Sequence, residues 1–378
     1  MAEKRKLFQE VSGDAKPQAA TPGVISAGGG ANHKTLRTWL WMMIVLIIVM
    51  VVVGGLTRLT DSGLSITEWN PVMGAIPPLS AADWDAAFAA YKTTSEYELQ
   101  NQGMSLGEFQ FIYWWEWGHR QLGRFIGVIW LLGFLGLWLF KMVPNNRRKA
   151  MFLIGPFIGV QGLIGWLMVA SGLQGTRTDV AAYWLMAHLG AAFALLEYIY
   201  WQAIMIGRTQ ADLFTAQRKG DVWLTRMTRV LIVMVFVQIL LGGLVAGLDA
   251  GRNYTDWPLM AGGFLPPDIL GMTPWWRNLY ENDGLVQFAH RMNAYALFAF
   301  AILVGLRAAR SAMKTTRKLF ARVGMILTLQ MILGVVTVMM SSPWYLAIAH
   351  QFLAILLWLM LIRGRQLARY PVGSVIRG

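Results

Sequence analysis

Cysteine is absent from the 378-residue chain, and histidine is scarce, with only five residues. Without cysteine there can be no disulfide, thiolate catalysis, iron–sulfur cluster or cysteine-bound zinc. Charged residues make up only 14% of the chain, whereas a soluble domain carries about 25%. These shortages argue against a soluble protein, and they leave any metal to His, Met, Tyr or carboxylate ligands.

The chain contains several long apolar segments. A membrane-spanning helix needs about 20 mostly apolar residues. Eight such stretches follow one another, at about 39–56, 122–140, 151–171, 180–206, 230–248, 285–306, 323–340 and 344–362. The last two are separated only by Ser341-Ser342-Pro343, which predicts a tight turn. The sequence therefore predicts an all-α integral membrane protein with eight transmembrane helices.

The formal net charge of +13 reflects topology. The N-terminal arm, the loops after spans two, four and six, and the C-terminus together hold 25 of the 33 basic residues but only 5 of the 20 acidic ones. Cytoplasmic loops are enriched in Lys and Arg. Both termini are therefore expected in the cytoplasm, with the chain in a bacterial inner membrane; the alternative is the mitochondrial inner membrane, with both termini in the matrix. Nucleic acid is not expected as a partner.

The two halves of the chain resemble each other. The matched features, in the same order in both halves, are Gly54-Gly55-Leu56 with Gly242-Gly243-Leu244, Glu68-Trp69 with Asp256-Trp257, Pro77-Pro78 with Pro266-Pro267, His119-Arg120 with His290-Arg291, Gln161 and Gly165 with Gln330 and Gly334, and His188 with His350. Each half holds four spans, so both enter the membrane in the same sense, as parallel repeats. The paired glycines are expected at close helix contacts.

This repeat predicts two four-helix bundles and five segments. They are a disordered cytoplasmic arm (1–37), an N-terminal half (38–207), a cytoplasmic linker (208–229), a C-terminal half (230–363) and a cytoplasmic tail (364–378). His33 falls in the arm, where it is expected to be solvated.

The other four histidines are predicted at one depth, near the outer ends of spans two, four, six and eight: His119, His188, His290 and His350. Ionisable residues within spans are costly and usually functional. Two imidazoles from facing helices suit axial ligation of haem iron. Zinc would need a third ligand, and a proton relay would need carboxylates along its path; the inner half offers only Glu197, on the helix face opposite His188.

The best interpretation is two haem sites, one per repeat. His119 would pair with His188, and His290 with His350. Haem propionates need cations, and three arginines near the histidines are candidates for that contact: Arg120, Arg124 and Arg291. A second interpretation, that these arginines reach to the membrane interface, carries equal weight.

The halves differ beside the first histidine of each pair. Glu116 lies three residues before His119, whereas Gln287 lies three residues before His290. Residues three apart share a helix face, so Glu116 is expected beside its histidine. A carboxylate there can accept protons or stabilise developing positive charge. The N-terminal half is therefore expected to contain the catalytic site, and the C-terminal half is expected to transfer electrons. The aromatic run at 109–117 is expected to form an interfacial belt, and the alternative is that it shapes the mouth of the site.

Several motifs together resemble the haem A synthase family. They are Glu-x-x-His at 116–119, GGLTRLTDSGLSITEWNPVMGAIPP at 54–78, FAHRMNAY at 288–295 and the late His350. The resemblance covers about residues 38–362. It is closest to the proteobacterial and mitochondrial form, which lacks the loop cysteine pair of the Gram-positive form.

The resemblance implies an oxidoreductase that converts a ring methyl group of haem O into a formyl group, giving haem A for haem-copper cytochrome oxidase. It implies that His119 and His188 hold the substrate haem O, that Glu116 is the catalytic carboxylate, and that His290 and His350 ligate the cofactor haem b. Membrane lipid surrounds such a chain. Haem O synthase, cytochrome oxidase assembly factors and a second copy of the chain are candidate partners.

Two other functions compete with this one. A non-catalytic di-haem electron carrier of cytochrome b type would use the same four histidines without needing Glu116, but such carriers stack their haems at different depths. A transporter built from parallel repeats would place polar residues at mid-membrane, where this chain has few.

Overall fold

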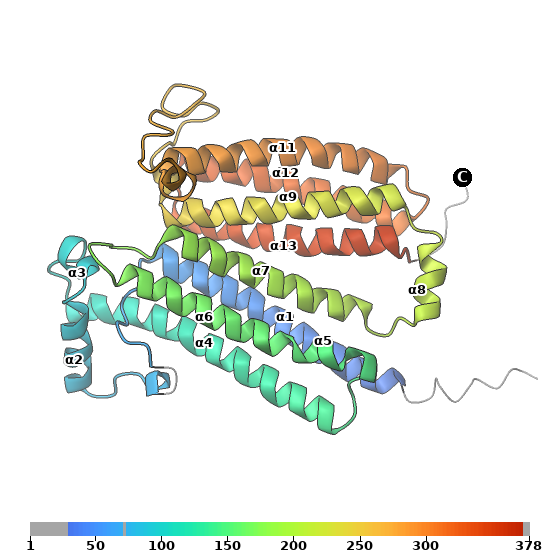
Figure 1. Ribbon diagram of the computed structural model, residues 1–378, viewed down its shortest axis with the longest axis horizontal. Helices are drawn as coiled ribbons and strands as arrows, with labels where there is room; N and C mark the ends of the chain where they lie inside the picture. The colour runs from blue at the N-terminus through green and yellow to red at the C-terminus, as the bar shows by residue number, and fades with distance from the viewer. Residues whose placement is uncertain (1–28, 71–72, 373–378) are drawn as a thin grey trace, which may run out of the picture.

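The computed structural model describes residues 29–70 and 73–372, and all named elements within these ranges are helices (Figure 1). Among the described residues, eight helices are long and apolar enough to cross a membrane, as predicted. They are α1 (Gly29–Leu59), α4 (Leu106–Leu139), α6 (Ile154–Gly172), α7 (Ala182–Met205), α9 (Val222–Gly247), α11 (Asp283–Ala309), α12 (Lys314–Met339) and α13 (Trp344–Arg369). The chain is an all-α integral membrane protein.

The eight long helices pack in two groups of four (Figure 1). In the N-terminal group, α1 and α6 each contact both α4 and α7. In the C-terminal group, α9 and α12 each contact both α11 and α13. Each group is a four-helix bundle. Within them, α4 lies diagonally opposite α7, and α11 lies diagonally opposite α13.

The two bundles meet along a seam formed by four helices. Here α7 packs against α9, α1 packs against α13, and α7 also contacts α13. Gly55 of α1 faces Ile348 of α13, and Gly243 of α9 faces Met186 of α7. A Cβ added to either glycine would lie 2.9 Å from that neighbour. The predicted close helix contacts at the paired glycines are therefore confirmed at these two positions.

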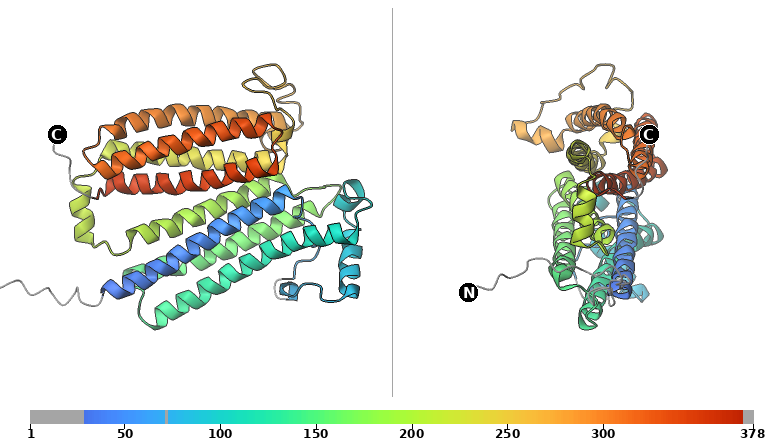
Figure 2. Two further views of the ribbon diagram at one scale, coloured as in Figure 1. Left: turned by 180° about the vertical axis from the view of Figure 1, so that it is seen from behind. Right: turned by 90° about the vertical axis from the view of Figure 1, so that its right-hand side faces the viewer.

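The two ends of the bundles differ (Figures 1 and 2). One end carries α2 (Ala81–Tyr91), α3 (Ser95–Leu99) and the segment between α9 and α11. The opposite end carries α8 (Gln210–Gln217), the start of α1 and the end of α13. The first and last described residues thus lie at the same end, which is the end of the basic loops.

Polar caps begin several helices outside the apolar runs. Ser105 and Glu108 form a capping box at the start of α4, and Ser80 with Asp83 does the same for α2. The remaining short elements are α5 (Arg148–Phe152), α10 (Asn278–Glu281) and four 3-10 turns, Met73–Ala75, Asn145–Arg147, Ala250–Arg252 and Trp275–Arg277.

Helix α4 has 34 residues, far more than a membrane requires, because its first turns extend outside and pack under α2 and α3. Phe109 and Tyr113 are buried there with Phe88 and Tyr91. The prediction of an interfacial aromatic belt is therefore wrong for these two residues. Their apolar side chains form a small core outside the bundle.

Several predicted boundaries also shift. Helix α1 begins at Gly29, so residues 29–37 are helical and the predicted arm was too long; residues 1–28 lie outside the described ranges. His33 lies on α1 and lines a cavity of about 180 Å³ with Arg147 and Arg208, rather than being fully solvated. The predicted linker contains α8, and α13 runs on to Arg369, because polar caps and tertiary packing extend helices beyond their apolar runs.

The turn between the last two long helices is confirmed. Ser341 and Ser342 both have positive φ, 59° and 54°, which reverses the chain between α12 and α13.

Candidate functional site

The four predicted histidines come from four different helices: His119 from α4, His188 from α7, His290 from α11 and His350 from α13. All four are half-buried. Three of them lie roughly two turns after their helix begins. His119 lies farther along its helix because α4 starts outside the bundle. The three histidines of α7, α11 and α13 thus lie at matched positions along their helices, and a common depth for all four stays a prediction.

The helices that carry each predicted pair are diagonal partners within one bundle. His119 and His188 project from α4 and α7, and they are close enough to interact electrostatically. His290 and His350, on α11 and α13, interact in the same way. Diagonal helices present their side chains to each other across the bundle axis. This geometry supports the pairing of ligands within each half.

A glycine of the neighbouring helix lies against each imidazole. A Cβ added to Gly54 or Gly242 would lie 3.2 Å from His119 or 3.3 Å from His290. A Cβ added to Gly165 or Gly334 would lie 2.9 Å from Cε1 of His188 or His350. The glycines that define the repeat therefore make room for the imidazole rings.

The donor set fits a haem better than a small metal centre. Among the described residues, no group of three or more His, Asp or Glu side chains could hold a metal ion. The Nδ1 atoms of His188 and His350 are buried without a hydrogen-bond partner. The two imidazoles in each bundle are the residues that could hold a haem iron.

Glu116 is buried and held by three donors. Its side chain is 3% exposed. Oε2 accepts from the Ser65 hydroxyl and from the Ile66 backbone N–H, both at 2.8 Å, and Oε1 pairs with Arg120 at 2.6 Å. Glu116 thus lies on the helix of His119, in a fixed orientation at the outer end of the N-terminal bundle. Sequence reasoning missed Ser65 and Ile66 as its partners.

Gln287, the counterpart of Glu116, acts as a donor instead. Its amide donates to the carbonyls of Ala250 at 2.7 Å and Tyr254 at 3.2 Å. Its Oε1 is buried without a hydrogen-bond partner. Replacing the carboxylate by an amide therefore reverses the direction of the hydrogen bonds as well as removing the charge.

Arg120 and Arg291 hold corresponding loops. Arg120 donates to the carbonyls of Ile66 and Glu68, at 3.0 and 3.1 Å. Arg291 donates to the carbonyls of Tyr254 and Asp256, at 2.8 and 3.0 Å. These acceptors occupy matched positions in the two halves, which supports the internal repeat.

The third candidate for propionate contact, Arg124, donates to the Asn70 carbonyl at 3.1 Å. All three candidate arginines therefore bind loop carbonyls. Contact with haem propionates stays a prediction.

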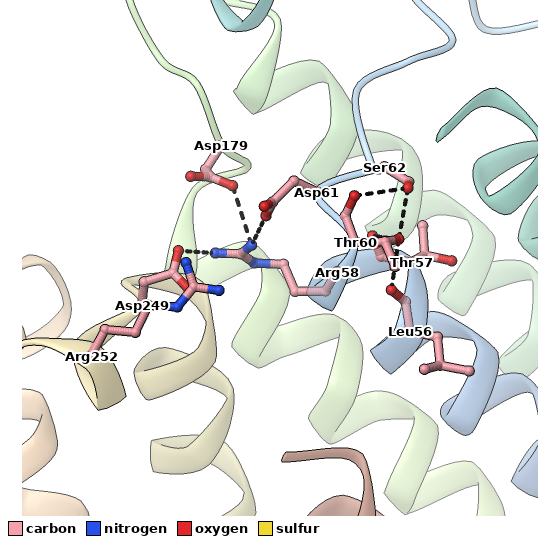
Figure 3. Close-up of polar contacts among 9 residues, drawn as sticks. All are labelled: Leu56, Thr57, Arg58, Thr60, Asp61, Ser62, Asp179, Asp249 and Arg252. Carbon is pink, nitrogen blue, oxygen red and sulfur yellow. Dashed lines mark hydrogen bonds and ion pairs between the residues drawn. The ribbon is translucent and has the colours of Figure 1, made fainter. Parts of the chain in front are cut away.

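An ion cluster that the sequence did not reveal joins the two halves (Figure 3). Arg58, at the end of α1, pairs with Asp61 at 2.9 Å, with Asp179 at 3.5 Å and with Asp249 of the other half at 2.6 Å. Burial raises the pKa of Asp179. Asp61 and Asp249 occupy matched positions in the two halves, and both have a φ of 47°.

A second buried acid lies outside the membrane. Glu96 of α3 is 3% exposed, and burial raises its pKa to about 8. The Tyr91 hydroxyl is in hydrogen-bonding contact with it, and the negative charge of Glu116 adds to the rise in pKa. The Glu96 Oε2 atom is buried without a hydrogen-bond partner. Glu197, by contrast, interacts with Arg365 near the inner end of α13.

Comparison with known proteins identifies relatives. The family model described as "Cytochrome oxidase assembly protein", named COX15-CtaA, matches residues 37–362. A haem A synthase of Dinoroseobacter shibae is 52% identical over 100% of this chain and 99% of its own length. Haem A synthases of Ruegeria pomeroyi and Jannaschia sp. are each 50% identical over 100% of both chains.

Proposed function

The chain belongs to the COX15-CtaA family of cytochrome oxidase assembly proteins, and we propose that it oxidises haem O to haem A in its N-terminal bundle. His119 and His188 hold the substrate haem O. His290 and His350 ligate haem b, which serves as the electron-transfer cofactor. The chain is accordingly an oxidoreductase and a multi-pass membrane protein.

The observation that carries the assignment of the two halves is the contrast between Glu116 and Gln287. Each lies three residues before the first histidine of its pair, yet only Glu116 is a carboxylate. The N-terminal bundle therefore has a carboxyl group beside its first histidine that can respond to charge developing on a bound haem. The C-terminal bundle has only a neutral amide, which suits a haem that gains and loses electrons without changing its substituents.

In the proposed reaction, the histidines and Glu116 of the N-terminal half have different roles. When bound, the haems would carry electrons: conversion of the methyl group to a formyl group with oxygen from water releases four electrons and four protons, and the electrons pass to an external acceptor. The imidazoles of His119 and His188 hold the porphyrin plane. The Glu116 carboxylate stabilises positive charge at the reacting carbon, or positions a water molecule and accepts its proton. Arg120, Ser65 and the Ile66 N–H fix the orientation of that carboxylate.

The distribution of charged residues supports an orientation of the chain in the membrane. The excess of basic loops at the end that carries α8 supports an orientation with both termini in the cytoplasm of a bacterial cell. Both haem sites then lie near the outer face of the inner membrane, where released protons can escape. Haem O synthase and oxidase assembly factors are the proposed protein partners, and a homo-oligomer is a further possibility.

The function is tested by co-expressing the chain with a haem O synthase and separating the extracted haems by chromatography and mass. Haem A or its hydroxylated precursor is expected. Recovery of haem B alone, or of haem B with unchanged haem O, would contradict the proposal and favour a di-haem electron carrier. Haem B that survives His119→Ala but is lost in His290→Ala would assign the two sites.

A further inference from the structure

Three of the four histidines share a second support besides the glycine that faces the ring. One helical turn before that glycine, the neighbouring helix carries a glutamine. The three pairs are Gln161 with Gly165, Gln238 with Gly242, and Gln330 with Gly334. Residues four apart lie on one helix face, so glutamine and glycine point together toward the histidine.

Each glutamine makes the same hydrogen bond. The side-chain amide of Gln161 donates to the backbone carbonyl of His188 at 2.9 Å. Gln238 donates to the carbonyl of His290 at 3.0 Å, and Gln330 donates to that of His350 at 3.1 Å. The amide therefore fastens the ligand-bearing helix to its neighbour at the level of the ligand.

Two of the glutamines also reach the imidazole itself. The Gln238 amide nitrogen lies 3.2 Å from Nδ1 and 3.0 Å from Nε2 of His290, and that of Gln330 lies 3.2 Å from Nε2 of His350. A ring nitrogen that binds iron cannot also accept a hydrogen bond, so the support that all three histidines share is the bond to the backbone carbonyl. Gln238 is held in turn by Asn293, whose amide donates to its Oε1 at 2.7 Å. Both histidines whose rings a glutamine reaches in this way belong to the C-terminal bundle.

His119 is the exception. The residue one turn before Gly54 is Met50, whose thioether has no proton to donate. Its methyl group lies instead against Gly123, where an added Cβ would be 3.3 Å away. Leu122 stands at the position that corresponds to Asn293. The neighbouring helix of His119 thus carries an apolar side chain at the position from which the other three histidines receive a hydrogen bond.

We propose that Met50 makes His119 the releasable ligand of the N-terminal haem site, so that product can leave after each reaction. This inference rests on the proposed function, in which the N-terminal haem is a substrate and the C-terminal haem stays bound. A resident cofactor benefits from two ligands that are both fastened in place. A substrate site must give up its product, and one loosely supported ligand lowers the barrier to that release.

The test exchanges the residues between the halves and measures haem loss. Met50→Gln and Gln238→Met are purified with their haems, apomyoglobin is added as a haem acceptor, and the haem that remains is identified by chromatography. Haem A and haem O report the N-terminal site, whereas haem B reports the C-terminal site. Met50→Leu, which adds no donor, is the matched control.

Met50→Gln is expected to slow the loss of haem A by roughly threefold to tenfold, the effect of one interhelical hydrogen bond in a membrane. The loss of haem B from the same protein should be unchanged, which also shows that the variant is folded. Gln238→Met is expected to speed the loss of haem B by a similar factor.

Equal rates of haem A loss in Met50→Gln and Met50→Leu would overturn the inference. If Met50→Gln does not fold, an unchanged rate of haem B loss in Gln238→Met overturns it independently. A failure of the proposed function looks different, since His290→Ala would then keep its haem B or no haem A would form in the unmodified protein.

Discussion

Glu116 is surrounded by donors that only a carboxylate can satisfy together. Arg120 supplies a charge, and Ser65 and the Ile66 N–H complete the set. A buried arginine that loses its partner is left with an uncompensated charge, which is costly. The carboxylate and its arginine therefore act as one unit, and the unit has no counterpart beside His290.

Glu116→Gln should reduce the formation of haem A by roughly 100-fold, because a positioned acid–base group contributes on that scale. Haem O should still bind, since His119 and His188 are intact. Extracted haems are quantified by chromatography after co-expression with haem O synthase. Glu68→Gln, at an exposed carboxylate in the adjoining loop, is the control. A Glu116→Gln variant with the rate of Glu68→Gln would remove Glu116 from the chemistry.

Glu96 makes the stability of the outer region depend on pH. Its pKa is about 8 in the folded protein, against an ordinary value of 4.5. Between these values the unfolded chain releases a proton that the folded chain keeps, so stability falls as pH rises through this window. Glu96→Gln should gain thermal stability relative to the unmodified protein as pH rises from 5 to 8. Glu98→Gln, exposed on the same helix, should leave the pH dependence unchanged.

At the scale of helices, the glycines that face the histidines decide how closely each imidazole can approach its neighbour. Helix α6 offers an internal comparison. A Cβ on Gly165 would press on the His188 ring, whereas a Cβ on Gly162 would meet nothing within 4 Å. Both positions are equally helical, so the difference between them isolates the contact with the ring.

Gly165→Ala should displace His188, at a cost of roughly 1–3 kcal/mol for overpacking, and so weaken retention of haem O and haem A. Haem B should be retained, because its proposed ligands, His290 and His350, lie in the other bundle. Gly162→Ala should behave like the unmodified protein. The visible spectrum and the extracted haems provide the measurement, and equal haem content in the two variants would show that the ring tolerates the added methyl group.

The sequence predicted the long helices better than the connections. The apolar runs predicted the eight membrane-spanning helices, and the internal repeat predicted which histidines and glycines correspond in the two halves. The extension of α4 was missed because its outer turns are aromatic and polar rather than uniformly apolar. A capping signature at Ser105 and Glu108 was present in the sequence and marks the true start of that helix.

At the scale of the molecule, the bundles are held together by a charged cluster as well as by apolar packing. Arg58 is 13% exposed and faces three aspartates from separate segments of the chain. No pattern along the sequence could indicate this cluster, because Asp179 and Asp249 come near Arg58 only after both bundles form. The glutamine supports escaped prediction for the same reason, as each acts across two helices.

Arg58→Met should destabilise the protein by roughly 2 kcal/mol, between the values for exposed and buried ion pairs. The loss should appear as a lower melting temperature in detergent. Arg277→Met, which removes a more exposed pair with Glu281, should change stability by less than about 1 kcal/mol. If the two substitutions lower the melting temperature equally, the Arg58 cluster does not stabilise the seam.

The seam itself has the symmetry of a dimer. Gly55 and Gly243 are counterparts in the repeat, and so are Ile348 and Met186, so each glycine meets the counterpart of the residue that the other one meets. Such reciprocal contacts define an isologous interface, the kind that two identical subunits form. At these two contacts the halves of the chain meet as the subunits of a homodimer do. Because one chain encodes both halves, the N-terminal half can carry Glu116 and Met50 where the C-terminal half carries Gln287 and Gln238. Two identical subunits could not differ at these positions.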